Sequence, residues 1–314
     1  MELKANTIES KIRKAQEILK SCHLCAHRCG VDRTSGEKGI CGAGMKLEVA
    51  SFTSHKGEEP FISGEGGSGA IFFSRCTMRC EYCQNWEISQ DRPESQSAVS
   101  VPLADIMLGL QRQGCHNINL VTPTHYMPQI LQALKTALEK GLEIPVVYNT
   151  NGYDSLELLK ILDGIIDVYM PDFKYFDDEK AKKYSNAENY VETAKAGIKE
   201  MFRQVGIMRF DENDIAVRGL LVRHLVLPNG ISDSNKVIKY LSTVSKEVWI
   251  SIMSQYSPQN RAGELQELNR SLLPEEYWGV VGLAQELKLE NYLIQEMSSA
   301  DVFLPDFDKE KPFI

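Results

Sequence analysis

The sequence lacks any run of about 18 apolar residues, the length that a membrane-spanning helix needs, so we expect no transmembrane segment. It lacks a basic excess as well. The formal net charge is −8, whereas binders of nucleic acid or membrane surfaces usually carry a basic patch. Residues 1–20 contain no continuous apolar stretch of the kind found in secretory signals. We therefore predict a cytoplasmic protein that has neither a nucleic acid nor a membrane as its partner.

Cysteine is scarce in most of the chain, because seven of the eight cysteines lie before residue 84. The eighth, Cys115, follows a helix-ending glycine and is predicted to be a buried thiol. A cytoplasmic protein keeps its thiols reduced, so clustered cysteines there are more often metal ligands or redox groups than disulfides. The remaining composition is ordinary for a globular protein, and 314 residues are enough for one α/β barrel.

Between residues 69 and 256, short apolar runs alternate with helical patterns. The runs are nearly continuous in apolar character, which is typical of strands buried on both faces. We predict strands at residues 69–74, 118–123, 145–150, 165–172, 220–228 and 248–253. Such alternation produces right-handed βαβ units and a parallel sheet. The predicted fold class is therefore α/β, a partial barrel of six strand–helix units, with a doubly wound open sheet as the competing architecture.

Helices are predicted between these strands from apolar positions at i, i+3, i+4 and i+7. Two of them are expected to end at glycines, Gly114 and Gly141, and a third to begin with Ser232 or Asp233 as its N-cap. In both candidate architectures, ligands bind at the C-terminal ends of the strands. Residues that follow the strands are therefore the candidates for function.

Three cysteines directly follow the first predicted strand: Cys76, Cys80 and Cys83, spaced C-x3-C-x2-C. A disulfide needs two thiols, and a closed structural zinc site usually takes four. Three thiolates can instead hold three irons of a [4Fe–4S] cluster and leave the fourth iron open. The open iron can bind the amino and carboxylate groups of S-adenosylmethionine (SAM), and reduction then cleaves a C–S bond to give a 5′-deoxyadenosyl radical. A zinc knuckle is the alternative interpretation.

This spacing after a strand, with an aromatic residue before the third cysteine, resembles the signature of the radical SAM superfamily. Phrases along nearly the whole chain, among them "GEKGICGAG", "HKGEEPFISG", "NINLVTPTHY", "VYNTNGY", "PDFKY" and "RHLVLPNG", resemble its pyruvate formate-lyase-activating-enzyme-like branch. The resemblance implies a [4Fe–4S] cluster, SAM, an electron donor such as flavodoxin or ferredoxin, and Tyr82 near the adenine. It also implies an N-terminal helix and cysteine-rich metal-binding extension at 1–60, followed by a radical SAM partial barrel with C-terminal helices at 61–314.

The second predicted strand departs from the activating enzymes, in which a Gly-Gly-Glu motif holds the amino group of the methionine moiety. Here Thr122, Pro123 and Thr124 take that place. By resemblance, backbone carbonyls or the Thr124 hydroxyl are expected to accept from the ammonium. His125 follows and is a candidate acid, base or substrate ligand, with a hydrogen-bonded structural histidine as the alternative.

The third strand ends in "NTNG", which resembles the "DTNG" that lies close to the ribose and methionine of SAM in the activating enzymes. Thr150 and Asn151 match that motif, and Asn149 replaces its acid. An amide can hydrogen-bond ribose hydroxyls but brings no charge, so we expect no cation site there. The alternative is that Asn151 only forms a turn.

Charged residues follow or interrupt two later strands. In "PDFK", which resembles "LDLK", Asp172 and Lys174 point to the same side, so Lys174 can meet a carboxylate of SAM or substrate, or pair internally with Asp172. Arg223 interrupts an apolar strand that resembles "IRYVVVP". A buried charge is costly unless it is paired, so we expect a contact with the SAM carboxylate. Glu58 and Glu59, in "GEEP", are not explained by this chemistry.

A second group of cysteines is spaced C-x2-C-x3-C-x11-C near the N-terminus. Four thiolates close a site, which can be a structural zinc or single-iron centre or an auxiliary [4Fe–4S] cluster. His23 and His27 are possible replacements among the ligands. The four cysteines are Cys22, Cys25, Cys29 and Cys41.

Together these features predict a radical SAM enzyme that reductively cleaves SAM. The resemblance to activating enzymes implies a protein substrate, with a glycine from which a hydrogen is removed. Two alternatives remain: a radical enzyme that modifies a peptide or a small molecule, and a metal-stabilised binding module without turnover. The open three-cysteine loop speaks against the binding module, because a purely structural site would be closed.

Overall fold

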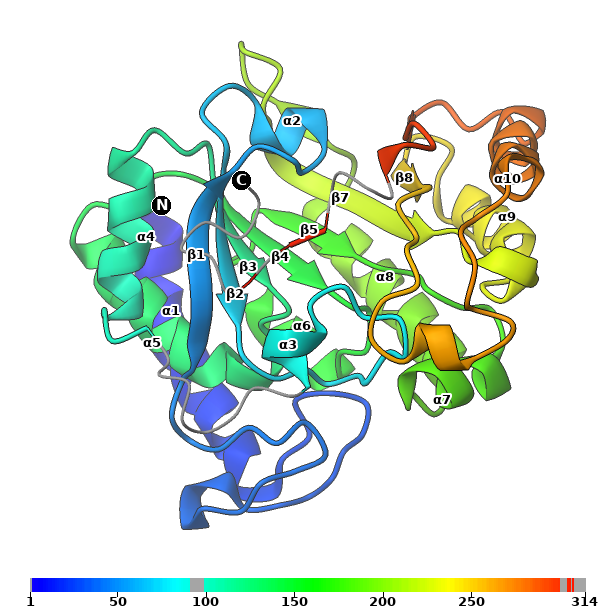
Figure 1. Cartoon of the computed structure of the whole chain (residues 1–314). Coiled ribbons are helices and arrows are strands. Elements are labelled where there is room, and N and C mark those ends of the chain that lie inside the picture. Colours follow the sequence, from blue (N-terminus) through cyan, green and yellow to red (C-terminus); the bar gives the residue numbers. More distant parts are fainter. Residues whose placement is uncertain (1, 91–98, 300–303, 306, 308–314) are drawn as a thin grey trace.

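A mostly parallel sheet forms the centre of the molecule, shown as a computed structural model in Figure 1. The structure describes residues 2–90, 99–299, 304, 305 and 307. Within these residues, strands join in the order β1-β2-β3-β4-β5-β7-β8-β9, and β6 pairs with β7 outside this order. The parallel strands are β2 (Ser68–Phe73), β3 (Ile118–Val121), β4 (Val146–Thr150), β5 (Val168–Pro171), β7 (Ala216–Leu225), β8 (Trp249–Met253) and β9 (Tyr292–Ile294). The antiparallel strands are β1 (Val49–His55), which pairs with β2, and β6 (Arg209–Phe210).

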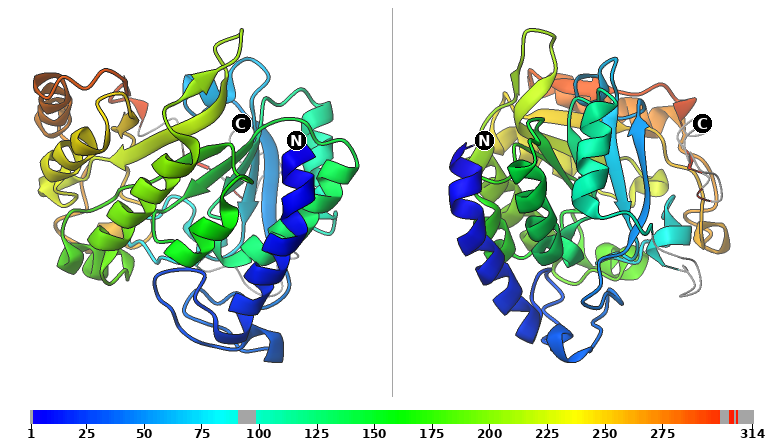
Figure 2. Two further views of the ribbon diagram at one scale, coloured as in Figure 1. Left: turned by 180° about the vertical axis from the view of Figure 1, so that it is seen from behind. Right: turned by 90° about the vertical axis from the view of Figure 1, so that its left-hand side faces the viewer.

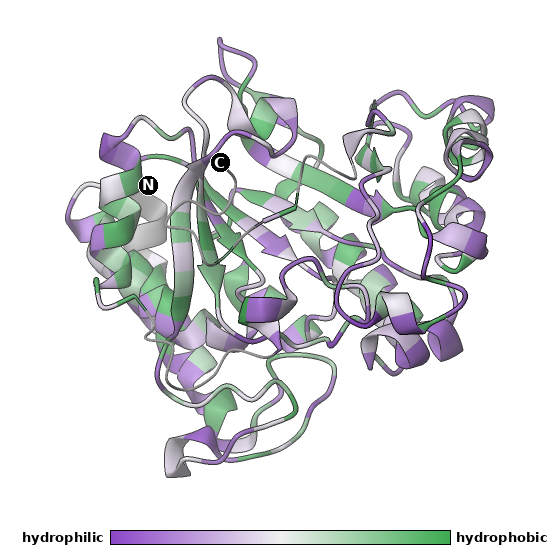
Figure 3. Cartoon of the chain, in the orientation of Figure 1, coloured by the Kyte–Doolittle hydropathy of each residue, from purple (hydrophilic) through white to green (hydrophobic). Residues whose placement is uncertain are grey.

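All six predicted strands are present, as β2, β3, β4, β5, β7 and β8. Every residue of β2, β4 and β5 is buried, in line with their continuous apolar sequences. Figure 3 shows the hydrophobic residues concentrated on these central strands and the hydrophilic ones on the surrounding loops and helix surfaces. Gly69 pairs with Ile118, and Ile118 with Val146, so the carboxyl ends of the strands meet at one edge. The functional site is expected along that edge.

Helices connect the strands and cover the outer face of the sheet, as the rear view in Figure 2 shows. This one-sided cover fits the predicted α/β partial barrel and not the competing doubly wound sheet, which carries helices on both faces. The helices are α1 (Glu2–Ile18), α2 (Pro60–Ser63), α3 (Trp86–Ser89), α4 (Leu103–Arg112), α5 (Met127–Glu139), α6 (Leu156–Leu162), α7 (Asp178–Ser185), α8 (Tyr190–Val205), α9 (Ser234–Val244) and α10 (Pro274–Glu286). Short 3-10 turns are η1 (Leu19–Ser21), η2 (Arg33–Ser35), η3 (Thr124–Tyr126), η4 (Pro228–Gly230) and η5 (Ala262–Glu264). In the described part of the chain, none of these helices has the length and apolar character needed to cross a membrane.

The predicted helix ends are confirmed at two glycines and at one N-cap position. Gly114 and Gly141 follow α4 and α5 with φ of +86° and +97°, a left-handed conformation that favours glycine. Asp233 does precede α9, but its own φ is +51° and its side chain makes no capping hydrogen bond. The Ser232 hydroxyl instead accepts from the Leu227 N–H at 3.2 Å. The predicted N-cap position is therefore confirmed at Asp233, although its side chain does not cap the helix.

The N-terminal residues are built into the barrel. Helix α1 packs on α5 and α6, and its Ile8, Ile12 and Ala15 belong to the main hydrophobic core. Strand β1 then extends the sheet beyond β2. Between them, the loops at the bottom of Figure 1 carry the four early cysteines, and the Ala26 N–H donates to the Tyr153 carbonyl at 3.1 Å. The extension is thus attached to the barrel through a shared core, a shared sheet and backbone hydrogen bonds.

Candidate active site

The three-cysteine loop leaves the carboxyl end of β2 and runs into α3, so the strand places it at the expected edge of the sheet. Cys76, Cys80 and Cys83 line one cavity of about 160 Å³, which we call the cluster cavity. Burial raises the pKa of the Cys76 thiol to about 12 and that of the Cys80 thiol to about 11. Thiols lose their protons when they bind a metal, and the bond to the metal offsets this cost.

Hydrogen-bond donors from three elements point at these sulfurs. The Ser185 hydroxyl, at the end of α7, donates to Cys80 Sγ at 3.0 Å, and Asn151 Nδ2 lies 3.4 Å from Cys76 Sγ. Ser89 Oγ, on α3, lies 3.4 Å from Cys83 Sγ. Donors of this kind stabilise negative charge on sulfur and tune a cluster that the sulfurs hold.

Most of the predicted SAM-binding residues line the same cavity. The ends of β3, β4, β5 and β7 bring them to it, although they are far apart in the sequence. Tyr82 belongs to the lining as well, and its hydroxyl shares a hydrogen bond of 2.7 Å with Tyr175. The predicted residues that line the cluster cavity are Tyr82, Thr122, Asn149, Thr150, Asn151, Asp172, Lys174 and Arg223.

Asp172, Lys174 and Arg223 form a buried ionic group in this cavity. Lys174 Nζ lies 2.6 Å from one carboxylate oxygen of Asp172, and Arg223 Nε lies 3.1 Å from the other. Burial opposes the ionisation of Asp172, but Lys174 and Arg223 outweigh it and hold its pKa below the usual value. Lys174 thus makes the internal pair that the sequence left open, while it remains at the wall of the cavity.

Arg223 also binds a carboxylate that sequence reasoning had not assigned. Its Nη1 lies 3.3 Å from Glu58 Oε2, and its Nη2 donates to Asn149 Oδ1 at 2.9 Å. Glu58 stands in the turn between β1 and α2 and accepts from Asn119 Nδ2 at 3.0 Å. The signal in the sequence was the "GEEP" phrase itself, but its place in the site depends on β1, which was not predicted.

Of the SAM-binding residues predicted in the turn after β3, only one lines the cluster cavity. Thr122, with φ of +53°, lines the cluster cavity, whereas Pro123 and Thr124 do not. The buried Thr124 hydroxyl donates to Asp154 Oδ1 at 2.7 Å, and that carboxylate also accepts from Thr150. Because Thr124 is fully buried outside the cluster cavity, its hydroxyl does not fit the expected role as an acceptor for the SAM ammonium.

Comparison with known proteins agrees with this geometry. A family described as "Radical SAM superfamily" matches residues 70–214. The chain is 31% identical over 296 residues to "Uncharacterized protein MJ0674" of Methanocaldococcus jannaschii. The matched region covers 92% of this chain and 81% of that protein. The chain belongs to the radical SAM superfamily. A second protein of that organism, "Uncharacterized protein MJ0808", is 26% identical over 56% of this chain and 52% of its own length.

Membership of the radical SAM superfamily implies a [4Fe–4S] cluster and SAM as cofactors. The cluster cavity fits this pair, because three half-buried thiols and the Asp172–Lys174–Arg223 group all line it. Three thiolates leave one iron free for SAM, and cationic side chains suit a carboxylate. The site thus has the donors that both cofactors need.

His125 lies away from the radical SAM centre. Its ring nitrogen Nε2 lies 2.9 Å from the Ser74 carbonyl oxygen, its side chain is buried, and it lines a different cavity. Burial lowers the pKa of His125 to about 4, so the ring is neutral. This placement does not fit the predicted role as an acid, base or ligand at the radical site, and it favours the structural alternative.

That other cavity, the N-terminal cysteine cavity, brings together the second cysteine group. All four of its cysteines line it, together with His27, Thr77 and Arg33. His23 does not, and its Nδ1 lies 2.6 Å from the Ser21 carbonyl oxygen. His27 Nε2 lies 2.8 Å from the Thr77 carbonyl oxygen, so both histidines have backbone partners. Among the described residues, no three side chains of His, Cys, Asp or Glu are arranged to hold a single metal ion.

Arg33 sets the electrostatics of the N-terminal cysteine cavity. Its side chain is fully buried and donates to the carbonyls of His125, at 2.6 Å, and Gly44, while its Nε has no hydrogen-bond partner. In the described part of the chain, no carboxylate forms an ion pair with it. Burial raises the pKa of Cys22 and Cys41, and the charge of Arg33 opposes that rise. A buried guanidinium without a carboxylate suits an anionic partner made of thiolates.

Proposed function

We propose that this protein reductively cleaves SAM at a [4Fe–4S] cluster held by Cys76, Cys80 and Cys83. The single observation that carries the proposal is the convergence of three half-buried thiols on one cavity at the carboxyl edge of a parallel sheet. When bound, the cluster supplies the electron that cleaves SAM to methionine and the 5′-deoxyadenosyl radical. Flavodoxin or ferredoxin is the proposed electron donor.

The side chains of the cavity are proposed to bind and orient SAM. Lys174 and Arg223 meet the carboxylate of its methionine moiety, and Asn149 and Asn151 hydrogen-bond the ribose. Tyr82 packs near the adenine, and the backbone around Thr122 accepts from the ammonium. Support for this comes from the position of all six residues in the lining of the cluster cavity.

The test is SAM cleavage by anaerobically reconstituted protein with dithionite, with 5′-deoxyadenosine measured by chromatography. We expect product from the wild type and none above background from Cys83→Ala. Cys115→Ala is the matched control, because that thiol is buried but does not line the cluster cavity. Equal product from wild type and Cys83→Ala would reject the proposed function.

We further propose that the substrate is a protein, as in the glycyl-radical-activating enzymes that the sequence resembles. In that case the radical removes a hydrogen from a glycine of a partner protein. Electron paramagnetic resonance of anaerobic cell extract, incubated with the active enzyme and SAM, is expected to show a glycyl radical signal that is absent with Cys83→Ala. Without that signal, a peptide or small-molecule substrate becomes the better assignment.

We also propose that Cys22, Cys25, Cys29 and Cys41 bind a metal centre through four thiolates. The buried guanidinium of Arg33 supports an anionic centre, whether zinc, iron or an auxiliary [4Fe–4S] cluster. Iron, zinc and sulfide are to be counted in the Cys76/Cys80/Cys83 triple-alanine variant, which retains only this group. Four irons and four sulfides identify a cluster and one zinc a structural ion, whereas a metal-free protein contradicts the site.

A further inference from the structure

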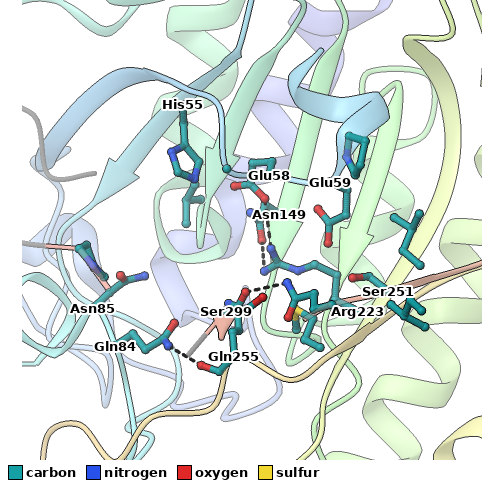
Figure 4. Close-up of a pocket in the computed structure, with 18 of the residues that line it drawn as sticks. His55, Glu58, Glu59, Gln84, Asn85, Asn149, Arg223, Ser251, Gln255 and Ser299 are labelled. Atoms are coloured by element: carbon teal, nitrogen blue, oxygen red, sulfur yellow. Dashed lines mark hydrogen bonds and ion pairs between the residues drawn. The ribbon is translucent and has the colours of Figure 1, made fainter. Parts of the chain in front are cut away.

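A second cavity, of about 350 Å³, adjoins the cluster cavity. The two share lining residues, among them Asn149, Arg223 and Met253. Figure 4 shows Glu58 and Glu59 reaching into the second cavity from the turn before α2, with Arg223 below them. We call it the acidic cavity, because both glutamates line it and neither lines the cluster cavity.

The charges around the acidic cavity do not balance. Asp172, Glu58 and Glu59 bring three carboxylates, whereas Lys174 and Arg223 bring two cations. Asp172 pairs with both cations, and Arg223 is shared between Asp172 and Glu58. In the described part of the chain, no cation lies within ion-pair distance of Glu59. When all three carboxylates are ionised, the network therefore has one negative charge more than its two cations can neutralise.

Glu59 is also the group with an unused hydrogen-bond acceptor. Its side chain is only 9% exposed, and its Oε2 has no hydrogen-bond partner. Burial raises the pKa of Glu59, although Arg223 opposes the rise. An unpaired buried carboxylate is costly, and such groups are normally matched by a cation or a donor. Since the side chain faces a cavity, a ligand in that cavity can provide the match.

The other walls suit an aliphatic chain. Phe72, Val121, Met253 and Leu293 supply apolar surface, and the remaining polar groups, such as Gln255, are neutral. An alkyl chain that ends in a cation would thus place its charge at Glu59 and its carbons along apolar side chains. The chain would extend toward Met253 and Asn149, which also line the cluster cavity.

We propose that the acidic cavity is the substrate subsite and that it binds an alkylammonium group, as in a lysine side chain, through Glu59 with help from Glu58. This inference rests on the proposed function, since it names the substrate class of that site. SAM does not fill this role, because its amino and carboxylate groups belong to the open iron in the cluster cavity. The turn after β1 would thus determine the substrate specificity of the enzyme.

The test measures binding apart from catalysis. Reconstituted holoprotein saturated with SAM is titrated calorimetrically with Nα-acetyl-lysine methylamide and with the norleucine analogue, which keeps the alkyl chain but has no charge. We expect the lysine probe to bind at least about tenfold more tightly, because a charge-assisted hydrogen bond in a buried site is worth that much. Glu59→Gln is expected to remove this preference while norleucine binding stays unchanged.

Matched variants keep the result interpretable. Glu65→Gln removes an exposed carboxylate of the same segment and is expected to bind like the wild type. Glu58→Gln is expected to weaken lysine binding less than Glu59→Gln, since Glu58 already pairs with Arg223. Thermal unfolding of each variant identifies any that fail to fold, and Glu58→Gln then carries the test.

The proposal is overturned if both probes bind equally, if neither binds, or if Glu59→Gln retains the lysine preference. The last result would mean that Glu59 is an uncharged acid in the complex, which glutamine imitates. Lysine-selective binding by a protein that does not cleave SAM would reject the proposed function and leave the subsite standing. SAM cleavage without lysine selectivity would reject the subsite and leave the proposed function standing.

Discussion

At the scale of single residues, two buried charged side chains stand out at the walls of cavities. Arg33 and Glu59 are both buried, and each has a polar atom without a hydrogen-bond partner. Each lines a cavity, Arg33 beside four thiols and Glu59 beside the cluster cavity. Within the described residues, neither Arg33 nor Glu59 forms an ion pair. Each is therefore expected to affect binding in the cavity that it lines.

Arg33 is predicted to stabilise the metal centre that we propose for the N-terminal cysteines. In the Cys76/Cys80/Cys83 triple-alanine background, Arg33→Met is expected to lower the metal bound per chain, because the thiolates lose their nearest buried cation. Metal analysis by mass spectrometry measures this, and Arg33→Lys is the control that keeps the charge. Equal metal content in the methionine variant and the parent would show that Arg33 has only a packing role.

Glu59 is predicted to make stability depend on pH. Its pKa is raised above the ordinary value of 4.5, so the folded state holds the proton that the unfolded state releases. Stability is therefore lost as the pH rises through the folded-state pKa. Because glutamine has no proton to lose, Glu59→Gln should be more stable than the wild type above about pH 4.5 in the absence of substrate, and its advantage should grow as the pH rises. Urea unfolding measures the gain, Glu65→Gln is the control, and a gain independent of pH would contradict the prediction.

Sequence reasoning found the residues whose partners follow from the order of the strands. Asn149, Asp172, Lys174 and Arg223 stand at or near the ends of parallel strands, so the fold alone brings them together. Sequence reasoning gave no role to Glu58, which contacts Arg223 although the two residues are 165 positions apart. Such a pair depends on tertiary packing, and no local pattern encodes it.

At the scale of elements, the predicted strands are those with long apolar runs, and the missed ones are short or mixed. β6 has two residues and β9 has three, too few for any periodicity. β1 is half-buried along most of its length, because it lies at the edge of the sheet with one partner, β2. Its sequence, "VASFTSH", accordingly lacks a clear alternation. Strand β1, which leads into the turn that carries Glu58 and Glu59, was therefore not predicted.

Asp154 is predicted to hold the turns after β3 and β4 in place. Its buried carboxylate accepts from Thr124, Thr150 and Tyr148, each at 2.7 Å. Asp154→Asn exchanges an acceptor for a donor, so some of these hydroxyls lose their partner, and we expect a loss of about 1–3 kcal/mol in stability. Urea unfolding measures it, with the exposed Asp105→Asn as the control, whose loss should be smaller. Equal losses would show that the network contributes little.

At the scale of the whole molecule, the two cysteine groups are neighbours. Thr77, inside the three-cysteine loop, lines the N-terminal cysteine cavity, and its carbonyl oxygen lies 2.8 Å from His27 Nε2. Its hydroxyl accepts from Asn151, which also reaches Cys76 Sγ. A change in the extension can therefore alter the geometry of the cluster cavity through one residue.

This coupling predicts how the protein unfolds when the metal centre proposed for the N-terminal cysteines cannot form. Since α1 and β1 share a core and a sheet with the barrel, the extension and the barrel should melt as one unit. Calorimetry of Cys22→Ala/Cys25→Ala is expected to show one transition at a lower temperature than that of the wild type. Cys115→Ala is the control, because it leaves the four N-terminal cysteines in place and changes only packing. An unchanged main transition with a separate early one would mean that the extension is an independent module. A single shifted transition accompanied by weaker SAM binding would connect the metal, through Thr77, to the radical site.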